Sequence, residues 1–233
     1  MLIPIGDDNI FGGARPIASY LFLFLNIFIF IYEISLGDRD LQIFINDFGA
    51  IPTEIMAGNN LTAIFTSMFL HGGWSHLIGN MLFLWIFADN VEAVLGTGKF
   101  ILFYLAGGII ASLAHIWMNA DSTIPSIGAS GAISAVLGAY LIMFPRSRIK
   151  LVFLIFFITF YISAIIFIGF WFIQQFMAAY IETGLDARTQ GVAWWAHIGG
   201  FLFGIICGIF YRSKAREFSF IPDYTDLHPR HRR

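Results

Sequence analysis

Two residues far apart in the sequence, Ser130 and His197, have the types and settings that hydrolytic chemistry needs. Ser130 lies in the tetrad Gly-Ala-Ser-Gly, and His197 is followed by Ile-Gly-Gly. A serine hydroxyl is a weak nucleophile until a base takes its proton, and histidine is the most frequent base. Glycines beside the serine let other backbone approach closely, and a helix that begins there presents free N–H groups to an oxyanion. The two residues therefore predict a nucleophile and its general base.

Each residue also has a structural interpretation. Ser130 alone is as well explained by an N-cap serine among small residues that pack helices, and His197 by a hydrogen bond between helices. His197 favours function because an ionisable group inside an apolar segment is a functional candidate by default. Small residues at 200, 204 and 208 share its helix face, and those at 131, 135 and either 138 or 139 form a matching row. Packing the two rows together would place Ser130 and His197 at one depth.

A second pair of polar residues, His76 and Asn80, lies on one face of a helix at the spacing i, i+4. We expect both to donate hydrogen bonds to an oxyanion, and we group Ala129 with them as an oxyanion or substrate-binding position. The alternative is a pair of interhelical hydrogen bonds that hold the preceding loop. The single cysteine, Cys207, excludes an intramolecular disulfide and cysteine-based metal sites, and the sequence has no HExxH motif.

The composition predicts the setting of these residues, an all-α polytopic membrane protein. Hydrophobic residues make up 58% of the chain, charged residues only 12%, and the mean hydropathy is +0.77. A globular domain carries about 25% charged residues. A spanning helix needs about 20 apolar residues. Read against that length, the apolar runs predict six transmembrane helices, at about 16–36, 74–91, 100–118, 129–144, 149–180 and 192–211. Residues 1–15 are expected to form a short tail before the membrane domain, and residues 212–233 a short tail after it in the sequence.

The placement of basic residues predicts the orientation. With six helices, 11 of the 13 Lys and Arg residues fall on the side that holds both termini. Basic residues are enriched on the cytoplasmic side, so both termini should be cytoplasmic and Ser130 should open to the outer side. No cleavable signal peptide is recognisable at the start of this sequence. A bacterial-type plasma membrane is the expected location.

Three segments together resemble the rhomboid family of intramembrane serine proteases. They are Phe-Leu-His-Gly-Gly-Trp-Ser-His at 69–76 with Asn80, Gly-Ala-Ser-Gly at 128–131, and Ala-His-Ile-Gly-Gly at 196–200. They fall on the second, fourth and sixth predicted helices in the family's order. The resemblance implies a rhomboid-like six-helix bundle in which Ser130 is the nucleophile and His197 the general base. It further implies that His76 and Asn80 assist the backbone N–H of Ser130 in the oxyanion hole.

The resemblance also implies the partners. The substrate would be a single-pass membrane protein cut in or near its transmembrane segment, within a lipid bilayer, with no metal or organic cofactor and no nucleic acid. The sequence leaves the oligomeric state open. Some members have a Trp-Arg pair in the first loop, where this chain has Leu-Thr-Ala-Ile-Phe at 61–65. Others place an aromatic residue four positions after the nucleophile, where this chain has Ser134, so His197 must be oriented in another way.

Two other classes of function compete with a protease. A catalytically silent relative that binds transmembrane segments as an adaptor has less support because Ser130 and His197 are both present. A small transporter has less support because the predicted helices carry no charged residue at mid-membrane depth. A probe that reacts only with activated serines would distinguish these classes.

Overall fold

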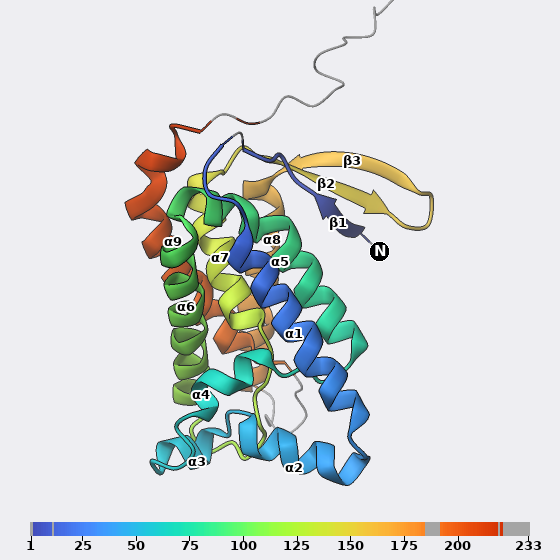
Figure 1. Ribbon diagram of the computed structural model, residues 1–233, viewed down its shortest axis with the longest axis vertical. Coiled ribbons are helices and arrows are strands. Elements are labelled where there is room, and N and C mark those ends of the chain that lie inside the picture. The colour runs from blue at the N-terminus through green and yellow to red at the C-terminus, as the bar shows by residue number, and fades with distance from the viewer. Residues whose placement is uncertain (1, 11, 185–191, 219, 221–233) are drawn as a thin grey trace, which may run out of the picture.

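The architecture is a helical bundle with a small β-sheet at one end and short helices at the other (Figure 1). It is known from a computed structural model that describes residues 2–10, 12–184, 192–218 and 220. Helix α7 packs against α5, α6 and α9, and α9 also packs closely against α6. Because α5, α7 and α9 all start at the end that carries the short helices, their N-terminal residues are neighbours.

Five helices in the described part of the chain are long and apolar enough to cross a membrane. They are α1 (Ile17–Ser35), α5 (Trp74–Leu95), α6 (Thr97–Met118), α8 (Ala164–Gly184) and α9 (Trp194–Ala215). The sixth, α7 (Ser130–Met143), has 14 residues, a length of about 21 Å. The prediction of a six-helix membrane bundle is confirmed.

The segment between α1 and α5 contains short helices. They are α2 (Asp38–Phe48), α3 (Pro52–Met56), α4 (Ala63–Thr66) and the 3-10 helix η1 (Ser67–Phe69). The rings of Tyr32 on α1 and Phe44 on α2 meet edge to face, with centroids 5.4 Å apart. Ala50 pairs with Ser126 in an isolated antiparallel bridge, which ties this segment to the loop before α7. The segment thus covers the end of the bundle where Ser130 lies.

The prediction of one helix over 149–180 is wrong in its first half. Residues 148–163 form a hairpin of β2 (Arg148–Phe153) and β3 (Ile158–Ser163), and helix α8 starts only at Ala164. In the hairpin Arg148 pairs with Ser163 and Phe153 with Ile158. The segment is rich in β-branched and aromatic residues, which favour strands.

The expected N-terminal tail is also partly wrong. Residues 2–6 form β1 (Leu2–Gly6), which pairs antiparallel with β2 and completes a three-stranded sheet (Figure 1). Of the expected C-terminal tail, residues 212–215 still belong to α9, and residues 219 and 221–233 lie outside the described part.

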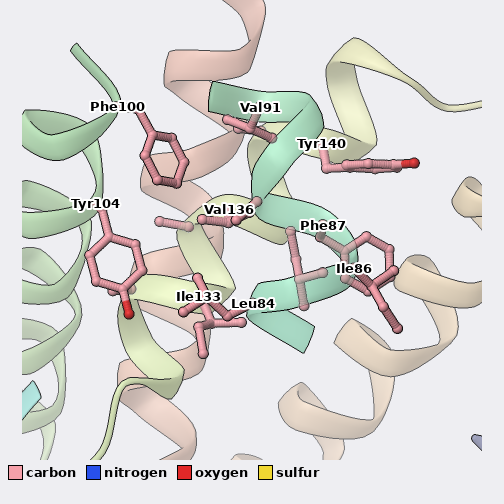
Figure 2. Packing of buried hydrophobic residues seen from close by; sticks show 14 of the residues in the cluster. Leu84, Ile86, Phe87, Val91, Phe100, Tyr104, Ile133, Val136 and Tyr140 are labelled. Carbon is pink, nitrogen blue, oxygen red and sulfur yellow. The ribbon is translucent and has the colours of Figure 1, made fainter. Parts of the chain in front are cut away.

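Aromatic and branched aliphatic side chains from three helices fill the centre of the bundle (Figure 2). Residues 131–140 of α7 are buried on every face of the helix, as expected for a helix surrounded by others. The core side chains labelled in Figure 2 are Leu84, Ile86, Phe87, Val91, Phe100, Tyr104, Ile133, Val136 and Tyr140. The core therefore holds α7 rigidly between its neighbours.

A polar cluster fastens the N-terminal segment to the sheet end of α7. One carboxylate oxygen of Asp7 accepts hydrogen bonds from the Tyr140 hydroxyl and from Nδ2 of Asn90, the latter at 2.9 Å. Tyr140 also contacts the Ser147 hydroxyl at 2.7 Å, and Asp8 forms an ion pair with Arg148 at 3.1 Å. Burial raises the pKa of Asp7 to about 8, with Asp89 and Asp8 adding to the effect, although the bonds from Tyr140 and Asn90 oppose it. The neutral form of Asp7 is therefore favoured in the folded protein.

Candidate active site

The structure brings Ser130 and His197 within hydrogen-bond distance. Ser130 is the first residue of α7 and His197 lies in the first turn of α9, 67 residues later. The Ser130 Oγ and His197 Nε2 atoms are 2.8 Å apart. This is the geometry that a serine needs to pass its proton to a base.

Close packing of α7 and α9 explains this meeting. A Cβ added to Gly200 would lie 2.1 Å from the carbonyl oxygen of Gly131, and one added to Gly204 would lie 1.9 Å from that of Ala135. Only glycine allows two backbones to approach so closely. The matching rows of small residues read from the sequence therefore do form the contact between the two helices.

The His76 side chain lies against the loop just before Ser130. A Cβ added to Gly128 would be 2.7 Å from Cε1 of His76, and Gly128 has a φ of +127°, which side-chain-bearing residues rarely adopt. The backbone N–H of Gly128 donates to the Ser67 carbonyl at 2.8 Å, which fixes this loop. The N–H of Gly72 donates to Nδ1 of His76 at 3.4 Å, which leaves the ring proton on Nε2. His76 is therefore a donor beside Ser130.

Asn80 lies one turn after His76 on α5, and its side-chain amide is near His71. Asn80 Nδ2 and His71 Nε2 are 3.0 Å apart, and the N–H of His71 donates to the carboxylate of Glu33 at 3.2 Å. An amide nitrogen has two protons, so Asn80 keeps one for a ligand while the other faces His71. Glu33 and His71 thus hold the loop that precedes His76.

A cavity of about 500 Å³ joins these groups. Its lining includes His76, Asn80, Ser130, Trp171 and His197. Ala129, just before α7, is not among the described residues that line the cavity, and its side chain is fully buried. The carbonyl of Ala129 instead accepts the N–H of Ile133 at 3.0 Å, the first bond of the helix.

Sequence reasoning missed one polar residue of the site, Gln175 on α8. Its Oε1 lies 2.8 Å from Nδ1 of His197, on the other side of the imidazole from Ser130. The available signal was a pair of amides, Gln174 and Gln175, inside an apolar helix. Ser134, where some rhomboids have an aromatic residue, instead donates to the Ser130 carbonyl at 2.6 Å.

Other polar side chains make their hydrogen bonds away from the dyad or lie outside the described residues. Nδ1 of His115 contacts Nδ2 of Asn119 at 3.3 Å near the C-terminal end of α6, and His228 and His231 lie beyond the described part. Glu92 on α5 binds the start of α1 by accepting the N–H of Ser19 at 2.8 Å. Within the described residues, His, Cys, Asp and Glu side chains form no group of three that could hold a metal.

Comparisons with known proteins agree with this arrangement. The model of the rhomboid domain matches residues 58–214, which include all the site residues described above except Glu33. The chain belongs to the rhomboid family. This confirms the resemblance read from the three motifs.

Rhomboid relatives come from several kinds of organism. The chain is 38% identical over 136 residues to "Rhomboid protease GluP" of Bacillus subtilis, covering 58% of this chain and 26% of that protein. It is 32% identical over 159 residues to "Rhomboid protein 1, mitochondrial" of Saccharomyces cerevisiae, covering 66% and 43%. It is 32% identical over 141 residues to the human "Presenilin-associated rhomboid-like protein, mitochondrial", covering 60% and 35%. The chain thus matches less than half of each relative's length.

The names of these relatives can be compared with the cellular membrane that the sequence predicted for this chain. The rhomboid domain and the apolar helices support a multi-pass membrane protein. The expectation of a bacterial-type plasma membrane is not supported, because two of these three relatives carry mitochondrial names.

Proposed function

We propose that this rhomboid is an intramembrane serine endopeptidase with a dyad of Ser130 and His197. The observation that carries the proposal is the 2.8 Å contact between the Ser130 hydroxyl and His197 Nε2 at the wall of a cavity. A family that includes a protein named as a protease adds support.

The reaction follows from the geometry in two steps. Ser130 Oγ attacks the scissile carbonyl carbon while His197 Nε2 takes the hydroxyl proton, which gives a tetrahedral oxyanion. His197 then gives that proton to the leaving amine as the C–N bond breaks. A water molecule, deprotonated by His197, hydrolyses the resulting ester and releases the new carboxyl end together with free Ser130.

The oxyanion would be held by donors from two helices. His76 supplies its Nε2–H, Asn80 one amide proton, and the peptide unit that joins Ala129 to Ser130 its N–H. Such donors stabilise charge that develops only during the reaction, in a site with little water.

The setting of the cavity supports a proposal for the substrate class. A catalytic centre enclosed by membrane helices is reached most directly from the bilayer, so we propose a single-pass membrane protein cut in or near its transmembrane segment.

Both termini are proposed to be cytoplasmic, with the cavity opening to the outer side of the membrane. A catalytically silent binder of transmembrane segments is the competing function.

The decisive experiment uses purified protein in liposomes with a fluorogenic transmembrane reporter. Ser130→Ala and His197→Ala should each abolish cleavage, and the double variant should be no worse, because the pair acts as a unit. Ser122→Ala, in the loop before α7, serves as the matched serine control. A fluorophosphonate probe should label the wild type and not Ser130→Ala. Cleavage by Ser130→Ala would refute the mechanism, and an unlabelled, inactive wild type would favour the binder.

A further inference from the structure

Helix α8 contacts the imidazole of His197 on the side away from Ser130. Gln175, which is only 7% exposed, places Oε1 at 2.8 Å from His197 Nδ1. The ring of Trp171, one turn earlier on α8, lies with its centroid 6.0 Å from that of His197, and Trp194 meets the imidazole edge-on at 6.0 Å. The indoles confine the ring, and among the residues that the structure describes Gln175 is the hydrogen-bond partner of Nδ1.

The orientation of the Gln175 amide is itself fixed. Its Nε2 donates to the Trp171 carbonyl at 3.1 Å, four residues earlier on the same helix. A buried amide without partners is costly, so the orientation that satisfies both ends is strongly preferred. In that orientation the carbonyl oxygen, an acceptor, faces His197.

An acceptor at Nδ1 decides which imidazole tautomer is present. The proton must reside on Nδ1 to be donated to Gln175, so Nε2 carries the lone pair that faces the Ser130 hydroxyl. This is the tautomer that a general base requires. In soluble serine proteases an aspartate has this task, and loss of its acceptor oxygen costs about 10⁴-fold in rate by favouring the wrong tautomer.

We propose that Gln175 is the positioning residue of the dyad, a neutral amide that sets the tautomer and orientation of His197. The inference rests on the proposed function. A neutral acceptor suits this place because an ionised carboxylate among membrane helices is expensive to bury. The role of Gln175 also explains how His197 is oriented without the aromatic residue that some rhomboids have at position 134. In this chain that position is Ser134, whose hydroxyl donates to the Ser130 carbonyl.

The test compares variants at two adjacent amides in the liposome assay. Gln175→Leu keeps approximate size but removes the acceptor, and should lower kcat by about 10²-fold or more with KM within about twofold of wild type. Gln174→Leu, at an exposed neighbour on the same helix, should behave as wild type. Wild-type kcat in Gln175→Leu would overturn the proposal.

A second variant separates positioning from packing. Gln175→Glu restores an acceptor and adds a charge that stabilises protonated His197, so activity should return while the acidic limb of the pH–rate profile moves to higher pH. The other titratable groups that influence His197 are His76 on α5 and His115 on α6, and they are unchanged in this variant. If Gln175→Glu were as inactive as Gln175→Leu at every pH, Gln175 would be structural only.

The experiments distinguish a failure of the proposal for Gln175 from a failure of the proposed protease function. If Ser130→Ala still cleaves, the dyad mechanism itself is wrong. If Ser130→Ala is inactive and Gln175→Leu is fully active, the dyad stands and only the role of Gln175 falls. Thermal unfolding of each variant in detergent identifies any that fail to fold, and the Gln175→Glu profile then decides the question.

Discussion

The imidazole of His76 occupies the space that a side chain on Gly128 would need. A Cβ there would lie 2.7 Å from Cε1 and 2.8 Å from Nε2 of the ring. The absence of that one carbon lets a donor from α5 reach the start of α7. The proposed oxyanion hole depends on this contact between a loop and a helix.

The first prediction concerns this contact. Gly128→Ala should displace His76 and strain a backbone with φ of +127°, and should lower kcat by about 10²- to 10³-fold, as loss of one oxyanion donor does. His76→Ala and Asn80→Ala should each act in the same direction. Gly98→Ala on α6, where an added Cβ meets nothing within 4 Å, is the control. Unchanged kcat in both His76→Ala and Asn80→Ala would remove these residues from the site.

The second prediction concerns substrate entry between α5 and α8. The ring of Phe167 on α8 stacks against Phe83 and Phe87, with centroids 6.1 and 6.2 Å away. Phe167→Ala should raise turnover of a transmembrane substrate if these rings close the entry route. Phe170→Ala, at a side chain 63% exposed on the same helix, should have little effect.

A cross-link tests the same route in the opposite direction. Cysteines at Phe83 and Phe167, in a Cys207→Ala background, should be joined by a short bifunctional thiol reagent that can be cleaved by reduction. Turnover of the membrane substrate should fall when the cross-link forms and recover on reduction. Full activity in a verified cross-linked sample would exclude this route.

The third prediction uses the raised pKa of Asp7, about 8 in the folded protein. An unfolded carboxyl ionises near its usual pKa of 3.8, so the folded state binds more protons between these values. Stability from Asp7 is therefore fully present below about pH 4 and is lost as pH rises through about 8. Thermal unfolding in detergent should show a midpoint that falls from about pH 5 to about pH 9.

Variants assign that pH dependence to Asp7. Asp7→Asn should flatten the curve over this range, while Asp38→Asn, at an exposed residue of α2, should leave it unchanged. The same pH dependence in Asp7→Asn and wild type would show that another group is responsible.

The fourth prediction concerns depth and orientation. Because α7 has only 14 residues, a helix that reaches one interface stops short of the other, since the hydrocarbon core is about 30 Å thick. Ser130→Cys, in a Cys207→Ala background, should react from the outer side with a small membrane-impermeant thiol reagent and poorly with a bulky one. Thr123→Cys in the exposed loop should react with both, and Ser213→Cys near the end of α9 only from the cytoplasmic side. Labelling of Ser130→Cys from the cytoplasmic side would reverse the proposed topology.

The sequence predicted the bundle, and it pointed to the residues that meet at the cavity, because both depend on local signals. Apolar runs of sufficient length identify spanning helices. The glycines after His197 and around Ser130 indicated that α7 and α9 pack closely, and they do. His76 and Asn80 could be placed on one helix face because they form an i, i+4 pair, and both line the cavity, while their role as oxyanion donors stays a prediction.

The hairpin at 148–163 and the role of Gln175 were not predicted, and each omission has a physical reason. The hairpin at 148–163 continues directly into α8, so a hydropathy reading sees one long apolar run and cannot separate strand from helix. Its abundance of branched and aromatic residues after Pro145 was the missed signal. Gln175 escaped because its partner is 22 residues away on another helix, and helix periodicity cannot predict which residue of one helix meets which residue of the next.

The location of Gln175 on α8 would couple substrate entry to the reactivity of the dyad. The same helix carries Phe167, which packs against α5, and the amide that holds the proton of His197 on Nδ1. An outward movement of α8 large enough to admit a substrate would lengthen the Gln175–His197 bond and would let the imidazole exchange tautomers. The serine would then regain its full nucleophilicity only after the helix returns. Such a protease would be inactive while α8 is displaced. Membrane proteins that enter the site and leave before the helix returns would therefore not be cut.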